Sequence, residues 1–256
     1  MDATRRRFLR MAGATAAGLA LFPVARALAT GKGSAAGTGA TLPARKWAMA
    51  VDMKKCRATE GCRQCMRACH LTHNVPQMGD SNEAVKWIWA ELFPSVFPSL
   101  GHDTIDQELE HKSFPVLCNH CVNAPCVRVC PTRATFKRED GIVMMDYHRC
   151  IGCRYCMAAC PYGARSFNFR DPRPSLKEIN PAYPTREKGV VEKCNFCAER
   201  LAAGAPPACV AACPHGALIF GDLEDPGSEI RRILRTAHAL RRKAELGTEP
   251  KVYYLL

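Results

Sequence analysis

Residues 150–161 of the sequence are CIGCRYCMAACP, in which four cysteines follow the spacing C-x2-C-x2-C-x3-C and a proline comes directly after. Three cysteines in so tight a loop can meet three corners of one cubane [4Fe–4S] cluster, with backbone N–H groups turned toward the sulfur atoms. The fourth cysteine stands where the chain leads away, so its thiol reaches a neighbouring cluster. The proline ends that segment and turns the chain. This run therefore predicts paired iron–sulfur clusters.

Related spacings occur three more times, and the four quartets account for all sixteen cysteines of the chain. The first quartet has the spacing C-x5-C-x2-C-x3-C, the second C-x2-C-x4-C-x3-C-P and the fourth C-x2-C-x11-C-x3-C-P. In chain order the quartets are Cys56, Cys62, Cys65 and Cys69; Cys118, Cys121, Cys126 and Cys130; Cys150, Cys153, Cys156 and Cys160; and Cys194, Cys197, Cys209 and Cys213. The sequence thus predicts four [4Fe–4S] clusters as cofactors and no substrate site.

Three other interpretations of the cysteines remain open. Disulfides suit an exported cysteine-rich chain, but repeated C-x2-C pairs bring sulfur atoms together on a metal. Zinc ribbons also use C-x2-C pairs, yet they do not carry a further x3-Cys-Pro three times over, so a zinc-stapled binding module is the weaker hypothesis. In a mixed array, one cluster is lost or converted to three irons, and the chain still conducts electrons.

The formal charge of +12 suggests nucleic-acid binding at first sight. Residues 1–29 contain five arginines and one aspartate, so their removal lowers the charge by four, to +8. Four oxidised [4Fe–4S] clusters with their thiolates would add roughly −8, about −2 each. The loaded protein is then near neutral, which argues against a nucleic-acid partner.

The first residues are typical of an export signal. The segment TRRRFLR (residues 4–10) precedes a mildly apolar run at 11–24, and Ala27-Leu28-Ala29 gives a small-x-small cleavage site. An Arg-Arg-x-Phe-Leu arrangement resembles the twin-arginine signal, whose route carries folded cargo, as cofactor insertion in the cytoplasm requires. We expect residues 1–29 to be the signal, residues 30–45 to be a flexible leader, and the protein to be periplasmic without a membrane span of its own.

The rest of the chain shows short elements between the cysteine loops. Residues 46–53 (KWAMAVDM) predict a strand, and the stretches 134–136 and 142–145 predict a hairpin around Asp140-Gly141. The segments that follow the last three quartets, PTRA (131–134), PYGA (161–164) and PHGA (214–217), resemble one another. This repetition indicates an α+β fold of two ferredoxin-like (βαβ) modules with large loop insertions, organised around four [4Fe–4S] clusters.

The predicted domain is residues 46–256, and its parts are an inner module at 118–170, an outer module of 46–73 with 191–222, an insertion at 74–117, and a C-terminal helix and tail at 223–256. Residues 228–246 predict a basic helix, with Ser228 as its cap and Glu229 in its first turn. Residues 171–190 predict a proline-rich loop.

The insertion at 74–117 contains the aromatic stretch WIWAELFPSVF, residues 87–97. These side chains either pack over the cluster loops or form a docking surface for a membrane partner. His70, His73 and His120 lie near quartet cysteines, but every quartet is complete without them, so we expect them to face solvent or to support the ligands.

The ordered quartets resemble the iron–sulfur subunits of the dimethylsulfoxide reductase and polysulfide reductase family. The x4 gap of the second quartet, the x11 gap of the fourth and the ending LGTEPKVYYL (residues 246–255) carry this resemblance. It implies a non-catalytic electron-transfer subunit that works between a redox partner and an integral quinone-reactive membrane subunit of the NrfD type. The first quartet departs from relatives, which usually have x2 where this chain has x5 through residues 57–61.

The resemblance also implies how the cysteines divide among the clusters. The implied sets are cluster 1, Cys56, Cys62, Cys65 and Cys213; cluster 2, Cys118, Cys121, Cys126 and Cys160; cluster 3, Cys150, Cys153, Cys156 and Cys130; and cluster 4, Cys194, Cys197, Cys209 and Cys69.

Within this family the sequence is most similar to the periplasmic O subunits of Dsr membrane complexes of dissimilatory sulfur metabolism. The stretches ACHLTHNVP (68–76) and VKWIW (85–89), with the twin-arginine signal, carry that resemblance. It implies a multihaem cytochrome c as a further partner. The alternative within the class is the iron–sulfur subunit of a molybdopterin tetrathionate or polysulfide reductase.

Overall fold

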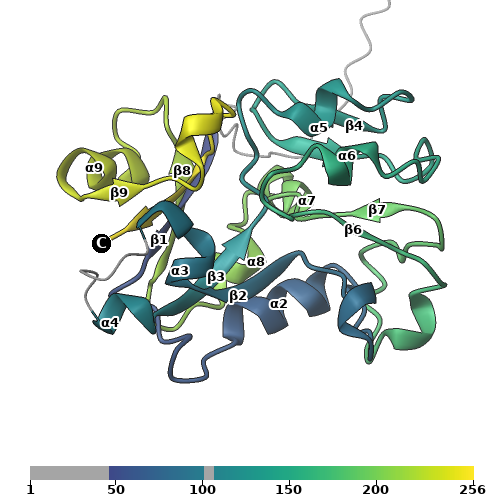
Figure 1. Cartoon of the computed structure of the whole chain (residues 1–256), viewed down its shortest axis with the longest axis horizontal. Helices are drawn as coiled ribbons and strands as arrows, with labels where there is room; N and C mark the ends of the chain where they lie inside the picture. Colours follow the sequence, from purple (N-terminus) through teal and green to yellow (C-terminus); the bar gives the residue numbers. More distant parts are fainter. Residues whose placement is uncertain (1–45, 101–106) are drawn as a thin grey trace, which may run out of the picture. The chain divides into compact units, whose positions relative to one another are not determined.

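A computed structural model of the chain (Figure 1) describes residues 46–100 and 107–256. The strands are β1 (Trp47–Asp52), β2 (Ile88–Leu92), β3 (Ser113–Leu117), β4 (Thr135–Lys137), β5 (Val143–Met145), β6 (Ser166–Phe167), β7 (Val191–Glu192), β8 (Leu218–Asp222), β9 (Ala239–Leu240) and β10 (Val252–Leu255). The helices are α2 (Gln64–Thr72), α3 (Phe93–Val96), α4 (Gln107–Glu110), α5 (Pro125–Arg128), α6 (Tyr155–Ala158), α7 (Ala198–Ala202), α8 (Ala208–Ala211) and α9 (Glu229–Thr236). The mixed content confirms the α+β class. The predicted signal (1–29) and leader (30–45) lie outside the described residues.

The largest sheet has the strand order β8-β1-β10-β9. β1 pairs in parallel with β10 and antiparallel with β8, in a register that places Val51 opposite Leu218. The strand predicted at 46–53 is therefore confirmed, and most of its side chains are buried. Because β1 leads into Cys56 and β8 follows Cys213, this pairing brings the two ends of the cysteine-bearing segment side by side.

Three two-stranded sheets carry the other cysteine loops: β2 with β3, β4 with β5, and β6 with β7. The β4–β5 pair confirms the predicted hairpin, and its turn uses Gly141 at φ +78°, a conformation that favours glycine. The Lys251 ammonium donates a hydrogen bond to the Gly141 carbonyl, which ties the approach to β10 to this turn. β3, β5 and β7 lead into the second, third and fourth quartets.

Most aromatic residues of the 74–117 insertion face inward. Trp87, Phe93 and Phe97 are buried, and the Trp87 indole donates a 3.0 Å hydrogen bond to Glu192 Oε2. Phe93 and Phe97 pack with Phe114 on β3. The docking hypothesis is therefore wrong for Trp87, Phe93 and Phe97, whose rings fill the core and are not available to a partner. Trp89 is partly buried, so the hypothesis stays a prediction for that ring.

The predicted C-terminal helix is shorter than the sequence pattern indicates. α9 begins at Glu229, as expected, but it ends at Thr236 because Ala237 is extended and β9 pairs with β10. Ile230, the buried residue of α9, contacts the face of the sheet beside β8, where Figure 1 shows the helix. Arg231, Arg232 and Arg235 thus lie on the short helix, whereas Arg241 and Arg242 follow the edge strand. Residues 171–190 form a loop with one 3-10 turn, as predicted.

Within residues 46–100 and 107–256, no helix combines the length and the apolar character that crossing a bilayer requires.

Candidate metal centres

The four cysteine loops share one backbone turn. The residue directly before the second cysteine of each quartet has a left-handed conformation: Gly61, His120, Gly152 and Phe196 have φ values of +89°, +43°, +69° and +55°. Only two of these residues are glycines, so the loop imposes this conformation on a histidine and a phenylalanine. The first quartet has the same turn before Cys62, although its first spacing is x5.

A second repeated feature follows the last cysteine of three quartets. Arg133, Gly163 and Gly216 each stand three residues after that cysteine, and their φ values are +55°, +63° and +58°. The similarity of the PTRA, PYGA and PHGA segments is therefore also a similarity of backbone conformation. Each segment turns the chain into a short strand, which is β4, β6 or β8.

Backbone N–H groups point at several of the sulfur atoms. The amides of Thr135, Phe196, Ala208 and Ala217 donate to the sulfur atoms of Cys130, Cys194, Cys197 and Cys213, at 3.4, 3.4, 3.3 and 3.3 Å. Such bonds stabilise a thiolate, which is the form that ligates a metal.

One pocket gathers four thiols that are far apart in the sequence. Cys56, Cys62, Cys65 and Cys213 line it together, and Cys65 lies on α2. Burial, followed by the proximity of Cys56 and Cys213, raises the pKa of Cys65 to about 12. Thiols packed this closely resist ionisation unless a metal neutralises them.

A second pocket holds Cys118, Cys121, Cys126 and Cys160. Burial, followed by the proximity of Cys118, raises the pKa of Cys121 to about 12, against a hydrogen bond from Thr248 that lowers it.

A third group is fully enclosed. Cys69, on α2, has Cys194, Cys209 and Cys197 as its nearest thiols, and all four are buried. Burial, and then these neighbours, raise the pKa of Cys69 well above its ordinary value. The helix α2 therefore presents Cys65 to one group and Cys69 to another, as α8 packs against it.

The remaining group contains the exposed Cys153 together with the buried Cys156. Cys153 is exposed, and Cys150 and Cys130 are partly buried. Cys156 lies near both Cys150 and Cys126. Burial acts to raise the pKa of Cys130, but the N–H of Thr135 and the hydroxyl of Thr132 outweigh it, so the pKa is lowered.

The donor set of these groups fits iron–sulfur clusters. All sixteen cysteines lie within the described residues as free thiols, and the two pockets that enclose four of them each offer sulfur in a mainly apolar lining. Cubane clusters take four thiolates and gain from N–H···S bonds.

Neighbouring groups adjoin one another in a definite order. Cys65 of the first pocket acts on Cys69 and on Cys209 of the enclosed group. Cys194 of the enclosed group is close to Cys118 of the second pocket. Cys126 of the second pocket is close to Cys156. The cysteine groups are thus neighbours in the order first quartet, fourth, second and third.

Comparison with known proteins agrees with this chemistry. Residues 109–172 and 179–223 match the family model described as "4Fe-4S dicluster domain". The Hdr-like menaquinol oxidoreductase iron-sulfur subunit 1 of Archaeoglobus fulgidus is 43% identical over 98% of this chain and 97% of that relative. The chain belongs to the 4Fe-4S dicluster domain family. The first quartet lies outside the matched ranges, while the other three fall inside them.

Two further relatives of this 4Fe-4S dicluster chain are also named as subunits of oxidoreductases. A subunit of the tetrathionate reductase of Salmonella typhimurium is 38% identical over 100% of this chain and 89% of that relative. The menaquinone reductase iron-sulfur cluster-binding subunit of Nitratidesulfovibrio vulgaris is 39% identical over 82% of this chain and 88% of that relative.

Sequence reasoning missed two buried cations that lie beside the cysteines, Arg165 and Lys193. Burial acts to lower the pKa of Arg165, but the nearby thiols of Cys126 and Cys156 outweigh it and raise the pKa. Lys193 is fully buried, and its ammonium donates to the carbonyl oxygens of Val143 and, at 2.7 Å, of Cys194. Both cations lie close to cysteine sulfur atoms, which carry negative charge when they ligate a cluster. Their only signal in the sequence is their distance from a quartet cysteine. Lys193 directly precedes Cys194, and Arg165 stands five residues after Cys160.

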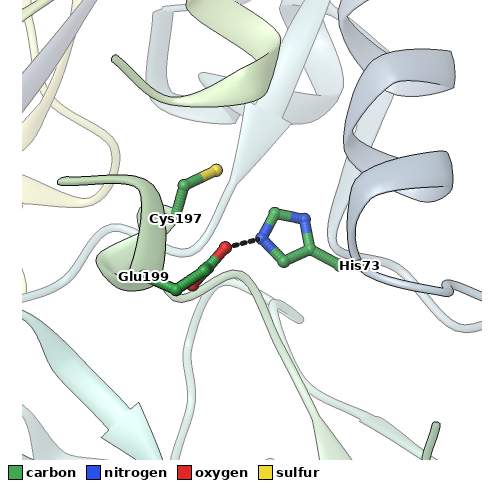
Figure 2. Close-up of side chains that lie close together, drawn as sticks. All are labelled: His73, Cys197 and Glu199. Carbon is green, nitrogen blue, oxygen red and sulfur yellow. Dashed lines mark hydrogen bonds and ion pairs between the residues drawn. The ribbon is translucent and has the colours of Figure 1, made fainter. Parts of the chain in front are cut away.

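His73 lies beside the cysteines, which agrees with the expectation that it supports the sulfur ligands. Figure 2 shows its ring between α2 and the start of α7, facing Glu199 and Cys197. Nε2 lies 2.7 Å from Glu199 Oε1, and Nδ1 lies 3.0 Å from the carbonyl oxygen of Cys69. Burial acts to lower the pKa of His73, but Cys197 and Glu199 raise it to about 9. Two acceptors on one ring indicate an imidazolium.

The other two histidines are inward-facing as well. His120 is buried and stacks on Phe196 with ring centroids 3.7 Å apart, and its Nδ1 accepts the Val143 N–H at 3.1 Å. Burial, followed by Lys193, lowers the pKa of His120 well below its ordinary value. His70 is partly buried, and burial lowers its pKa. The solvent-facing alternative is therefore wrong for His73 and His120.

Proposed function

We propose that this chain carries electrons through four [4Fe–4S] clusters between a quinone-reactive membrane subunit and a redox partner. Each cluster supplies reversible one-electron transfer when bound. The observation that carries the proposal is the proximity of thiols in successive cysteine groups, which leads from the partly exposed first pocket through enclosed thiols to the group of the exposed Cys153.

The proposed ligand sets are those that the family resemblance implies. They are Cys56, Cys62, Cys65 and Cys213; Cys118, Cys121, Cys126 and Cys160; Cys150, Cys153, Cys156 and Cys130; and Cys194, Cys197, Cys209 and Cys69. The shared pocket linings support the first two sets, and the proximity of Cys69 to three fourth-quartet thiols supports the last. Cys150 and Cys156, which are close to each other, support the set that contains them.

The two-module arrangement accompanies these sets. The first and fourth quartets share one sheet and the α2–α8 contact, while α5 and α6, which carry Cys126 and Cys156, pack on each other. We propose that residues 46–73 with 191–222 form the outer ferredoxin-like module and residues 118–170 the inner one.

For its partners, we propose an NrfD-type integral membrane subunit and a multihaem cytochrome c, in a Dsr-type complex of sulfur metabolism. Two relatives named for menaquinol oxidation or menaquinone reduction support a quinone-linked role. The arginine cluster and cleavage site within residues 1–29 support export by the twin-arginine route to the periplasm.

A second candidate is the iron–sulfur subunit of a molybdopterin tetrathionate or polysulfide reductase. The tetrathionate reductase subunit that aligns with this whole chain favours it. Purification of the native complex separates the two, because haem accompanies the first and molybdenum the second.

The proposed function is tested by a redox titration of anaerobically prepared protein, followed by electron paramagnetic resonance. Several clusters should be reduced in separate steps as the potential falls. A colourless protein that dithionite does not change would refute the proposal.

A further inference from the structure

A basic pocket of about 460 Å³ opens beside the first cysteine group. Its charged lining consists of Arg57, Arg63 and Arg67, with His215 and the single acid Glu60, and we call these residues the basic pocket. The four basic residues are exposed to solvent. Cys62 lines both this pocket and the neighbouring one that gathers Cys62 with three other thiols.

The x5 spacing of the first quartet builds one wall of this pocket. The other three quartets begin with C-x2-C, so residues 57–61 are longer by three positions. They form an ordered turn in which the Gly61 N–H donates to the Ala58 carbonyl at 3.1 Å. Ala58 is buried, and the Ser113 N–H donates to Thr59 Oγ1 at 2.9 Å, which fixes the turn to β3. The extra residues thus hold Arg57 at the rim.

The arginines differ in how firmly they are held. Arg63 donates to the carbonyl oxygens of Ala58 and Cys62, at 2.7 and 2.9 Å, so its guanidinium is positioned in advance. Arg57 pairs with Glu60 at 3.5 Å in an exposed, weak contact. Within the described residues, the Arg67 side chain has no hydrogen-bond or ion-pair partner. Among the side chains of the lining, Glu60 is the single acid, so apart from the cluster that Cys62 would hold, the pocket offers positive charge.

The N-terminus of α2 adds to the positive electrostatic potential of the pocket. α2 begins at Gln64, a residue of the pocket lining, and its first turn contains no acidic residue and no side-chain cap. Free N–H groups and the helix dipole then favour an anionic group at the same place as the arginines.

We infer that the basic pocket docks a carboxylate-rich surface of an acidic redox partner, which exchanges electrons with the first cysteine group. The inference rests on the proposed function and adds the kind of partner and the place where it binds. Charge complementarity identifies the occupant, since three arginines and a histidine face one acid. Cys62 in the pocket wall gives the docked partner a short path to the cluster that this thiol would hold.

The test uses the anaerobically loaded full chain and two probes of opposite charge. Cytochrome c is basic, and its succinylated form carries carboxylates in place of lysine ammonium groups. One electron leaves the dithionite-reduced protein, after removal of excess dithionite, and converts ferric haem to ferrous, which stopped-flow absorbance records. The variant R57E/R67E reverses the pocket charge, and R232E/R235E on α9 changes the net charge equally on exposed residues elsewhere.

Wild type and R232E/R235E should reduce succinylated cytochrome c about tenfold faster than R57E/R67E at low ionic strength, and salt should remove the difference. Equal rates for the two variants would overturn the docking site. Selective inhibition by sulfate at constant ionic strength would overturn it as well, because the occupant is then a small anion. Iron and sulfide are measured first, so protein without clusters refutes the proposed function, whereas loaded protein without a charge preference refutes only the docking site.

Discussion

The two exposed ends of the cysteine path differ in the side chains around them. At the first quartet, Cys62 lies in the wall of a pocket lined with arginines. At the third quartet, the exposed Cys153 is flanked by Ile151 and Tyr155, whose exposed fractions are 67% and 65%. The same kind of cysteine loop therefore presents a cluster of arginines at one end, and at the other two exposed apolar side chains beside one exposed arginine, Arg154. The two ends accordingly suit partners of different chemistry, one acidic and one apolar.

The largest expected effect separates the enclosed middle of the path from its ends. Cys197→Ser removes a thiol from the enclosed fourth group, so it should lose about four irons and block electron passage between the ends. Cys153→Ser removes a thiol at the exposed end and should leave reduction of succinylated cytochrome c by the first end unchanged. Iron analysis measures the loss of a cluster in each variant, and the number of electrons that pass rapidly to succinylated cytochrome c in the stopped-flow experiment measures passage between the ends.

A Cys197→Ser protein that keeps full iron content and full electron passage would show that the fourth group is not on the path. Cys197→Ala provides a control, since it excludes ligation by a serine oxygen.

The apolar end is tested by membrane retention of the native complex. Ile151→Asp with Tyr155→Ser should release most of the subunit from membranes, because both side chains are exposed and a charge opposes an apolar contact. R57E/R67E should leave retention unchanged. Release by the arginine variant and not by the apolar variant would reverse our assignment of the two ends.

Removing a buried cation should change the reduction potentials of the clusters near the third quartet more than those near the first quartet. Arg165→Gln removes a positive charge near Cys126 and Cys156, so reduction of the adjacent clusters becomes harder. We expect a midpoint about 60 mV lower, the equivalent of about 1.4 kcal/mol for one electron. The exposed Arg128→Gln on α5 is the matched control and should shift it by less than about 15 mV. Equal shifts for both variants would contradict a local effect.

The last effect concerns the hairpin that leads to the third quartet. Burial lowers the pKa of Lys251 to about 8, although Asp140 acts to raise it. Because the folded pKa lies below the unfolded value of about 10.4, the unfolded chain binds more protons between pH 8 and 10.4, and stability rises with pH across that window.

The gain should be on the order of 1–3 kcal/mol, a few degrees in apparent unfolding temperature. Lys251→Gln should lack this rise, as measured by anaerobic thermal unfolding at pH 8 and pH 10. A variant that shows the same rise as the wild type would assign it to another group.

The cysteine spacing predicted the metal chemistry because tight loops leave few ways for thiols to converge. The strand at 46–53 and the hairpin around Gly141 were equally accessible, since alternation and a turn residue determine them locally. The position at which α9 ends could not be predicted from the sequence, because the pairing of β9 with β10 overrides helical propensity. The positions of Trp87 and Lys193 were also out of reach, since their partners Glu192 and Val143 are more than forty residues away in sequence.

The assignment of the sixteen cysteines to four [4Fe–4S] clusters is tested most directly by metal analysis of anaerobically prepared protein. Iron, acid-labile sulfide and zinc are measured per chain. We expect about sixteen irons and sixteen sulfides. About twelve to fifteen irons would indicate that one cluster is lost or altered, for which the expanded first quartet is the first site to examine. Stoichiometric zinc without sulfide, found also in protein from the native host, would contradict the assignment.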